Sequence, residues 1–386
     1  RILMVTREQP GEKLFGLGKS LAPVIGELKR RGYVIRYLSQ QDMPLGMRSR
    51  LGRWQVRLAS LPCLRGCESR KALLGAWLER FAMALLAARL AEREHFTHVH
   101  LHDPWLAAAF RFLRRVFRLR RVRWGITEHG FGSYARATRD DGLQQSPHVH
   151  AVLRRLEAKT LTAADWVVVP TRRSLVKLTE DLNLIKAPRH WQVIPHARPV
   201  DDFPERGQAR SQLGWCSGQL YVLGIGRLVP LKRFDLLVRA CAIVARQVPL
   251  NLVLLGAGDV DSLHREAASC GLHSLTIIAT EHVPLYIAAA DIYVSSSQSE
   301  SFGLANLEAL GGGLPAVCTA VGGVPEVVGD AAVLIPANDV DALVKTLSEL
   351  AGDAALRHRL GEKGREQFLC WPDLNTVGSA YVELYR

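Results

Sequence analysis

The sequence predicts an α/β protein with two doubly wound parallel sheets, one in each half of the chain. Short apolar runs of strand length alternate with helical patterns up to about residue 194, and the same alternation starts again near residue 220. A stretch rich in proline and charge separates the two runs, Arg198-Pro199-Val200-Asp201-Asp202-Phe203-Pro204. At 386 residues the chain is long enough to form two cores.

The first half predicts six strands with helices between them. The expected strands are Ile2–Val5, Tyr33–Leu38, His98–Leu101, Val122–Ile126, Trp166–Val169 and Gln192–Ile194. The expected helices include Leu21–Arg31, Leu73–Arg93, Trp105–Val116, Val149–Ala163 and Arg172–Leu182. Strands that alternate with helices of this length indicate a parallel sheet covered on both faces.

The second half repeats this organisation. Its expected strands are Leu220–Ile225, Asn251–Leu255, Leu275–Ile278, Ile292–Val294, Pro315–Cys318 and Ala332–Leu334. Its expected helices include Arg233–Val248, Asp259–Cys270, Leu285–Ala290, Ala305–Leu310 and Val340–Leu350. Ligands of such sheets bind at the carboxyl ends of the strands, so we expect the site in a cleft between the two domains.

The composition is that of a soluble globular protein, with 48% hydrophobic and 23% charged residues. The net charge of +13 is unevenly shared: residues 1–200 hold 36 Lys and Arg against 16 Asp and Glu, and residues 201–386 hold 14 against 21. We expect the basic half to meet something anionic. The seven cysteines are scattered and read as free thiols, which favours a reducing compartment, and we expect a cytoplasmic protein.

The segment Met43–Arg70 stands apart from the alternation. Its apolar residues recur at helical spacing on one face, at Leu51, Trp54, Leu58 and Leu61, and its arginines line another, at Arg50, Arg53 and Arg57. A basic amphipathic helix with a tryptophan suits the surface of an anionic bilayer, so the protein could lie peripherally on the inner face of the cytoplasmic membrane. An apolar face packed on the domain explains the pattern equally well.

The polar loop that follows Ile292–Val294 carries the strongest local signal. We expect Ser301 to cap a helix that starts at Phe302, so that the amides of Gly303 and Leu304 lie at a helix N-terminus. Such a terminus attracts phosphate or sugar oxygens. Glu300 at its mouth and Glu308 two turns further along could hold hydroxyl groups of an extended ligand.

Two cations follow the first strand of the second half. In Gly224-Ile225-Gly226-Arg227-Leu228-Val229-Pro230-Leu231-Lys232, Arg227 leaves the strand and Lys232 comes five residues later. Two cations that converge on a cleft suit a diphosphate leaving group. A structural ion pair at Arg227 and a solvated Lys232 are the alternative.

Taken together, these segments resemble the retaining glycosyltransferases of family 4, which have the GT-B fold of two Rossmann-like domains facing a central cleft. The resemblance covers most of residues 219–336 through G-R-L-x-P-x-K, E-S-F-G-L followed by E-A, and four further segments. Those four are Leu255-Gly256-Ala257-Gly258-Asp259, Ala289-Ala290-Asp291-Ile292-Tyr293-Val294-Ser295, Gly312-Gly313-Leu314-Pro315-Ala316-Val317 and Gly322-Gly323-Val324-Pro325-Glu326. The first half matches more loosely, at Gly16-Leu17-Gly18, Thr127-Glu128-His129-Gly130 and Ala164-Asp165-Trp166-Val167-Val168-Val169.

The resemblance implies roles for these residues. Arg227 and Lys232 would hold the donor's phosphates and Glu308 the ribose hydroxyls. Glu300 and the amides of Phe302, Gly303 and Leu304 would hold the donor sugar. His129 would face that sugar across the cleft, and the loop with Gly16 and Gly18 would approach the donor or acceptor. One departure is visible, because Ile194-Pro195-His196-Ala197 stands where many relatives carry Ile-Pro-Asn-Gly.

The resemblance also implies the reaction and the division of the chain. We expect a metal-independent transfer, without a cofactor, from a nucleoside-diphosphate sugar to a saccharide or lipid-linked acceptor of a cell-surface polysaccharide or glycolipid. The first domain would span residues 1–196, a linker 197–217 and the donor-binding domain 218–370. A helix at 371–386 would cross back to the first domain.

Other functions remain as weaker alternatives. A non-catalytic scaffold at the membrane would be free to lose the site residues. The presence of Arg227, Lys232, Glu300, Glu308 and His129 therefore argues against a scaffold. A P-loop nucleotidase is disfavoured because Lys13 replaces the first glycine ahead of Gly18-Lys19-Ser20. Asp259-Val260-Asp261 and Asp339-Val340-Asp341 read as helix caps rather than metal motifs. The dense arginines between Arg111 and Arg123 lack any nucleic-acid module, so we expect no nucleic-acid partner.

Overall fold

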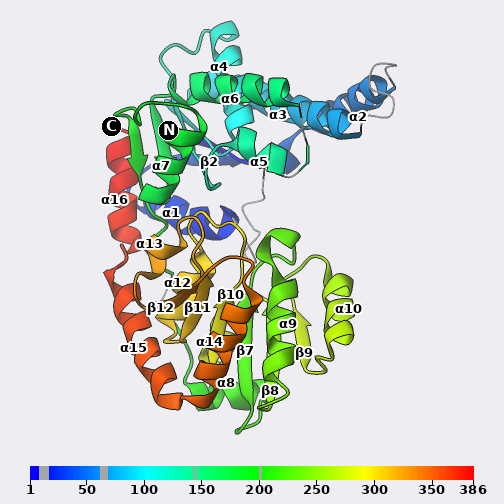
Figure 1. Cartoon of the computed structure of the whole chain (residues 1–386). Coiled ribbons are helices and arrows are strands. Elements are labelled where there is room, and N and C mark those ends of the chain that lie inside the picture. The colour runs from blue at the N-terminus through cyan, green and yellow to red at the C-terminus, as the bar shows by residue number, and fades with distance from the viewer. Residues whose placement is uncertain (8–16, 61–67, 141, 144–145, 200–201) are drawn as a thin grey trace. The chain divides into compact units, whose positions relative to one another are not determined.

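The computed structural model describes residues 1–7, 17–60, 68–140, 142–143, 146–199 and 202–386 (Figure 1). These residues form two compact units. Unit 1 comprises the described residues up to Pro195 together with Val377–Arg386, and unit 2 comprises His196–Thr376. All twelve expected strands are present, with bounds that differ from the expected ones by at most two residues.

Unit 1 is built on a six-stranded parallel sheet of order β2-β1-β3-β4-β5-β6. The strands are β1 (Ile2–Val5), β2 (Ile35–Leu38), β3 (His98–Leu101), β4 (Arg123–Thr127), β5 (Trp166–Val169) and β6 (Trp191–Val193). The helices are α1 (Leu17–Arg30), α2 (Leu45–Ala59), α3 (Glu68–Arg93), α4 (Pro104–Val116), α5 (Tyr134–Asp140), α6 (Pro147–Leu161), α7 (Arg172–Asp181) and most of α16 (Leu374–Leu384), with a short 3₁₀ helix η1 (Gln40–Asp42).

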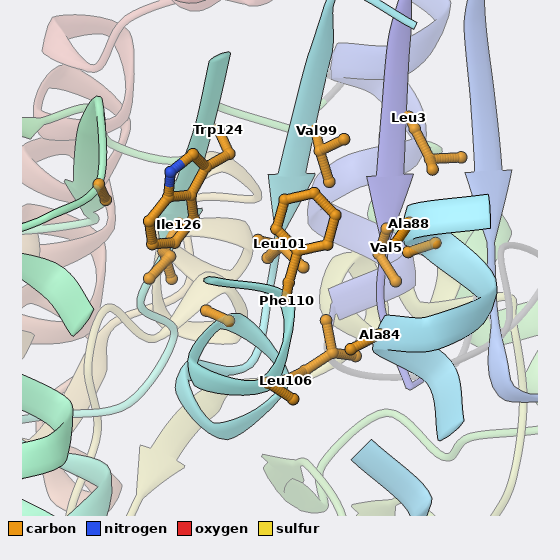
Figure 2. Close-up of a cluster of buried hydrophobic side chains, with 14 of the residues drawn as sticks. Leu3, Val5, Ala84, Ala88, Val99, Leu101, Leu106, Phe110, Trp124 and Ile126 are labelled. Atoms are coloured by element: carbon orange, nitrogen blue, oxygen red, sulfur yellow. The ribbon is translucent and has the colours of Figure 1, made fainter. Parts of the chain in front are cut away.

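One face of this sheet packs against α3 and α4, as Figure 2 shows. Leu3 and Val5 of β1 and Val99 and Leu101 of β3 are fully buried there. The small side chains of α3 at this surface, Ala84 and Ala88 among them, let the helix lie close to the strands. β1 and β5 are apolar throughout, as expected for strands covered on both faces.

Unit 2 contains the second six-stranded parallel sheet, of order β12-β11-β10-β7-β8-β9. Its strands are β7 (Leu220–Ile225), β8 (Leu250–Leu255), β9 (Leu275–Ile278), β10 (Ile292–Ser295), β11 (Ala316–Thr319) and β12 (Ala332–Ile335). Its helices are α8 (Arg206–Leu213), α9 (Phe234–Val244), α10 (Val260–Cys270), α11 (Val283–Ala289), α12 (Leu304–Gly311), α13 (Val324–Val328), α14 (Val340–Gly352) and α15 (Ala354–Cys370), with a 3₁₀ helix η3 (Pro230–Lys232).

Residues 197–217, expected as a linker, belong to unit 2 and contain α8. Two ion pairs hold this helix, because Arg206 and Arg210 both reach the buried carboxylate of Asp291. The same carboxylate accepts the backbone N–H of Tyr221 at 2.8 Å, so α8 is fixed to the start of β7. Composition alone did not reveal this, since the partner of both arginines lies about eighty residues further along the chain.

The described part of Met43–Arg70, which follows η1, contains α2 and the start of α3. Met43 is buried and Leu51 packs on the core, as a packing helix requires. Trp54, expected on the same stripe, is instead 56% exposed. Leu61 lies outside the described residues. No helix in the described parts of the chain is long and apolar enough to cross a membrane.

Three aspartates read as caps in the sequence do cap helices. Asp103 accepts the N–H groups of Trp105 and Leu106 at 2.9 and 3.0 Å at the start of α4. Asp259 accepts from Ser262 at 3.0 Å, and Asp339 accepts from the third residue of α14 at 2.9 Å. The D-x-D motifs of unit 2 are therefore helix starts.

Candidate functional site

The topology of unit 2 places two polar loops side by side. β7 and β10 are neighbours in the sheet, but β7 leads to β8 on one side while β10 leads to β11 on the other. Such a reversal of strand order separates the connecting segments at the carboxyl edge and leaves room for a ligand. The loops after these two strands are those that carry Arg227 with Lys232 and Glu300 with Gly303.

Within unit 2, Lys232 and Glu300 form an ion pair through Nζ and Oε2. Both side chains remain partly accessible, at 21% and 19% of their full exposure. Arg227, at the end of β7, is exposed. The expected phosphate-binding and sugar-binding residues are therefore in direct contact with each other.

Backbone hydrogen bonds hold the two loops in place. Ser296 Oγ donates to the carbonyl of Lys232 at 2.9 Å, and Gln298 N donates to the carbonyl of Leu231 at 2.8 Å. On the other side, Gly323 N donates to the carbonyl of Glu300 at 2.9 Å. The Lys232–Glu300 pair is thus supported by rigid loops rather than by two free side chains.

The glycines after β7 and β8 allow the backbones of the two following loops to approach each other closely. Gly226 N donates to Leu255 O at 2.9 Å and Leu228 N to Ala257 O at 2.8 Å, so the two loops pair almost as strands do. A Cβ on Gly256 would lie 2.0 Å from the carbonyl oxygen of Gly226. Gly256 therefore positions the loop that carries Arg227 and need not touch a ligand.

Helix α12 starts later than expected. Its first residue is Leu304 and its N-cap is Gly303, not Ser301. Gly303 adopts φ +86°, a conformation that favours glycine, and this allows the chain to turn into the helix without a side-chain cap. The first helical hydrogen bonds come from Asn306 and Leu307 to Gly303 O, so the amides of Leu304 and Ala305 lie in the open first turn.

Three buried side chains support this helix start. Phe302 is 1% exposed and meets the rings of His196 and Trp371 edge-on, with centroids 4.9 and 5.2 Å away. Asn306 accepts from Tyr293 Oη at 2.8 Å, whereas its Nδ2 is buried with no partner in the described structure. Glu308, one turn after Leu304, is buried on the same helix.

At the corresponding strand ends of unit 1 there is a row of histidines. His100 bonds Tyr385 Oη at 2.6 Å through Nδ1 and Thr127 Oγ1 at 2.7 Å through Nε2. His102 stacks on His100 with centroids 4.7 Å apart, and its Nδ1 lies 2.9 Å from Nε2 of His129. His129, expected to face the donor sugar, is therefore held by a second histidine.

Burial keeps His100 and His102 uncharged. It lowers the pKa of His100 to about 3, and it lowers the pKa of His102 well below the ordinary value. Next to His129, burial raises the pKa of Glu128 well above its usual range, with further contributions from Glu157 and Asp103. At these strand ends, unit 1 thus holds His100 and His102 as neutral hydrogen-bonding groups.

Comparison with known proteins identifies the family of the chain. The model of the Glycosyl transferase 4-like domain matches residues 15–196, and that of Glycosyl transferases group 1 matches residues 205–367. A D-inositol 3-phosphate glycosyltransferase from Geodermatophilus obscurus is 30% identical over 315 residues, which cover 74% of this chain and 67% of the relative. The chain belongs to the GT-B glycosyltransferases of family 4.

Other family members are more distant. The N-acetyl-alpha-D-glucosaminyl L-malate synthase of Bacillus anthracis is 26% identical, over 79% of this chain and 78% of its own. The match to the D-inositol 3-phosphate glycosyltransferase of Streptomyces avermitilis, at 27% identity, spans 62% of that protein's length.

Solved structures confirm the two-domain GT-B fold. Sucrose-phosphate synthase from Thermosynechococcus elongatus gives a TM-score of 0.78 at 20% identity and covers 100% of this chain and 98% of its own. Anabaena HepE, solved in complex with UDP and glucose, gives 0.70 at 16% identity and covers 99% and 98%.

For this glycosyltransferase, the structure brings together most of the expected donor residues. Lys232 and Glu300 form an ion pair, Gly303 and Leu304 form the start of α12, and Glu308 follows on the same helix. Gly18 is buried in the first turn of α1, while Gly16 lies outside the described residues.

Sequence reasoning did not identify His102 as the partner of His129, nor Asn306 and His196 as supports of α12. Asn306 stands inside the E-S-F-G-L-A-N segment, so its unpaired buried amide could have been suspected from the motif. His196 was visible as a departure from the family pattern, but its contact with Phe302 links residues more than a hundred positions apart.

Proposed function

We propose that the chain transfers a sugar, with retention of anomeric configuration, from a nucleoside-diphosphate sugar to a saccharide or lipid-linked saccharide. The observation that carries this proposal is the Lys232–Glu300 ion pair at the reversal of strand order in unit 2, beside the start of α12. A cation, a carboxylate and open amides at one strand edge suit a ligand with both phosphate and sugar hydroxyl groups.

The donor would replace the Lys232–Glu300 contact with two contacts of its own. Lys232, together with the exposed Arg227, would hold the diphosphate, while Glu300 and the amides around Gly303 would hold the sugar. Glu308 would hold the ribose hydroxyls.

As the bond between the sugar and the diphosphate breaks, negative charge grows on the departing phosphate. The two cations would stabilise that charge, and a dissociating sugar would acquire oxocarbenium character. The leaving phosphate can take the proton of the acceptor hydroxyl, which attacks from the same face. Because side chains supply the positive charge, we expect activity to persist in EDTA.

On the acceptor side, His129 would contact the sugar as a hydrogen-bonding group oriented by His102. We place the acceptor in cell-surface polysaccharide or glycolipid synthesis, because unit 1 is strongly basic and suits an anionic acceptor or membrane. Relatives named for D-inositol 3-phosphate add a phosphorylated polyol to the acceptors worth assaying.

Helix α2 would attach the protein peripherally to an anionic membrane. Leu45, Trp54 and Val56 are all more than half exposed, and Arg57 lies over the Trp54 ring at 5.8 Å. Trp54→Ala should reduce co-sedimentation with phosphatidylglycerol vesicles. Val176→Ala, an equally exposed site on α7, should not. Equal binding of all three proteins would count against α2 as the attachment site.

A thermal-shift screen against UDP, GDP, ADP and their sugars tests the donor site. UDP comes first because it occupies the structurally similar Anabaena HepE. One nucleoside diphosphate should raise the melting temperature of the wild type and fail to do so for Arg227→Ala and Glu308→Gln. If none shifts the melting temperature, or if both variants respond like the wild type, the donor site is elsewhere.

A further inference from the structure

Unit 1 also contains a cluster of arginines, at the end of its sheet opposite the histidine row. A pocket of about 460 Å³ is lined by Arg111, Arg114, Arg115, Arg120, Trp124 and Ala163. Trp124 is the second residue of β4, and Ala163 comes three residues before β5, so this arginine pocket lies at the amino ends of these strands. His102 and His129 follow the carboxyl ends of β3 and β4.

The pocket is built from the last turns of α4 and the turn after it. Arg111 and Arg115 are four residues apart on α4 and therefore share one face of the helix. Arg114 Nη2 donates to the carbonyls of Leu119, Arg120 and Val122, at 3.4, 3.4 and 3.1 Å, and so holds the turn that presents Arg120. The guanidinium of Arg114 also lies 5.9 Å from the Trp124 ring centre.

Trp124 gives the pocket a rigid aromatic wall. The side chain is fully buried, its ring centre lies 6.2 Å from that of Phe110 on α4, and it is labelled in Figure 2. Its indole Nε1 has no hydrogen-bond partner among the described residues, but Trp105, Trp166 and Trp191 share this property. The arginines around the cavity, and not this buried donor, therefore point to a ligand.

The charges of the pocket are poorly neutralised by the protein itself. Across the described residues, none of its four arginines lies within ion-pair distance of a carboxylate. The pKa of the Arg114 guanidinium is lowered, mainly by burial and also by the charge of Arg115, although Asp165, which accepts Trp124 N at 2.7 Å, opposes this shift. Like charges one helical turn apart repel, and this repulsion would be relieved by a multivalent anion between them.

An ordinary explanation covers only part of this arrangement. Arginines near a helix C-terminus commonly bind nearby backbone carbonyls, and Arg114 binds those of the turn that follows α4. Arg111, Arg115 and Arg120 form no such bond with the described residues, and their side chains line the pocket. Guanidinium groups bind phosphate oxygens in pairs, and several of them around one cavity favour a ligand with more than one phosphate.

We propose that the arginine pocket binds a small anion with two or more phosphate groups, at a site separate from the donor loops of unit 2. The anion is either a soluble polyphosphate or the headgroup of a phosphorylated lipid, since both present the same oxygens. The site is independent of the proposed transfer reaction, because it shares none of the residues assigned to the donor.

Calorimetric titration of the full chain with inorganic tripolyphosphate at low salt tests the proposal. Arg227→Ala serves as the background, so that phosphate binding at the donor loops does not mask the second site. On this background Arg111→Gln/Arg115→Gln should weaken tripolyphosphate binding at least tenfold. The matched pair Arg118→Gln/Arg121→Gln removes the same charge from exposed residues that do not line the pocket, and should change binding less than twofold.

A second variant protects the test against misfolding. Arg120 is exposed on the turn, so Arg120→Gln should fold normally and still weaken binding, whereas Arg121→Gln should not. Co-sedimentation with vesicles that contain a phosphoinositide identifies the source: dependence on Arg111 and Arg115 in this assay points to the lipid headgroup. Equal losses in the lining and matched variants, or no binding of either probe, would overturn the proposal.

Discussion

The strand ends of the two units differ in how they handle charge. In unit 2, Lys232 and Glu300 are partly accessible and oppositely charged, on loops fixed by backbone hydrogen bonds. In unit 1, His100 and His102 are buried, and burial keeps them neutral by lowering their pKa values. The difference suggests that unit 2 binds its ligand by charge, whereas unit 1 positions a group by hydrogen bonding.

The sharpest way to break this comparison is to remove charge from unit 2. Arg227→Ala should lower kcat/KM by about 10²–10³-fold, the size of effect seen when one group that stabilises transition-state charge is lost. Because Arg227 is exposed, the melting temperature should stay unchanged. Arg246→Ala, another exposed arginine of unit 2, provides the control. Similar kcat/KM values for both variants would show that the charge of Arg227 is not used.

Substitutions in the histidine row should lower kcat and leave donor binding almost unchanged. We expect His129→Ala to lower kcat by about 10²-fold, within the range for a group that contacts the reacting centre. His102→Ala should lower kcat by about tenfold, because it acts only through the 2.9 Å contact that orients His129. The donor Kd should change little in either variant. If His102→Ala still lowers kcat when His129 is already alanine, its effect does not pass through His129.

Substitution of Gly303, in the sharp turn before α12, should have a smaller effect, mainly on the free energy of unfolding. Gly303→Ala places a Cβ 2.5 Å from Asn306 Nδ2 at φ +86°, and should cost about 1–3 kcal/mol of unfolding free energy. It should also weaken donor binding, because the open amides of α12 would shift. Gly352→Ala in α14 meets no atom within 4 Å and should be neutral or stabilising. Chemical denaturation measures both, and equal stability of the two variants would contradict the assigned role of Gly303.

Sequence patterns predicted the sheets well because parallel strands buried on both faces read as short apolar runs, such as Ile2–Val5 and Trp166–Val169. They also placed Lys232 and Glu300 after strands of the same sheet, but the contact between the two side chains was not predicted. They could not predict that Gly303 rather than Ser301 is the N-cap of α12, because this depends on the backbone angle at Gly303. Nor could they predict long-range partners such as Asp291 for Arg206 or His102 for His129, since these depend on packing.

The smallest expected effect concerns His196, which packs on Phe302. Burial lowers its folded-state pKa to about 4, from 6.5 when unfolded. The unfolded chain therefore takes up a proton first, and stability falls as the pH drops from about 6.5 to about 4. In His196→Asn, the decrease in unfolding free energy on acidification should be smaller by about 1–2 kcal/mol. Unfolding curves at pH 7 and pH 4.5 measure it, and an unchanged pH dependence would show that His196 is accessible to protons in the folded state.

The central claim is that donor binding replaces the Lys232–Glu300 ion pair, and Glu300→Gln tests it most directly. Calorimetry should give the Kd of the active nucleoside diphosphate, with and without its sugar, for the wild type, Glu300→Gln and Lys232→Ala. With Lys232 released, Glu300→Gln should bind the sugar-free diphosphate a few-fold more tightly but lose the additional affinity contributed by the sugar, and Lys232→Ala should weaken both ligands. If Glu300→Gln weakens the sugar-free diphosphate as much as Lys232→Ala does, the two residues do not divide the donor between them.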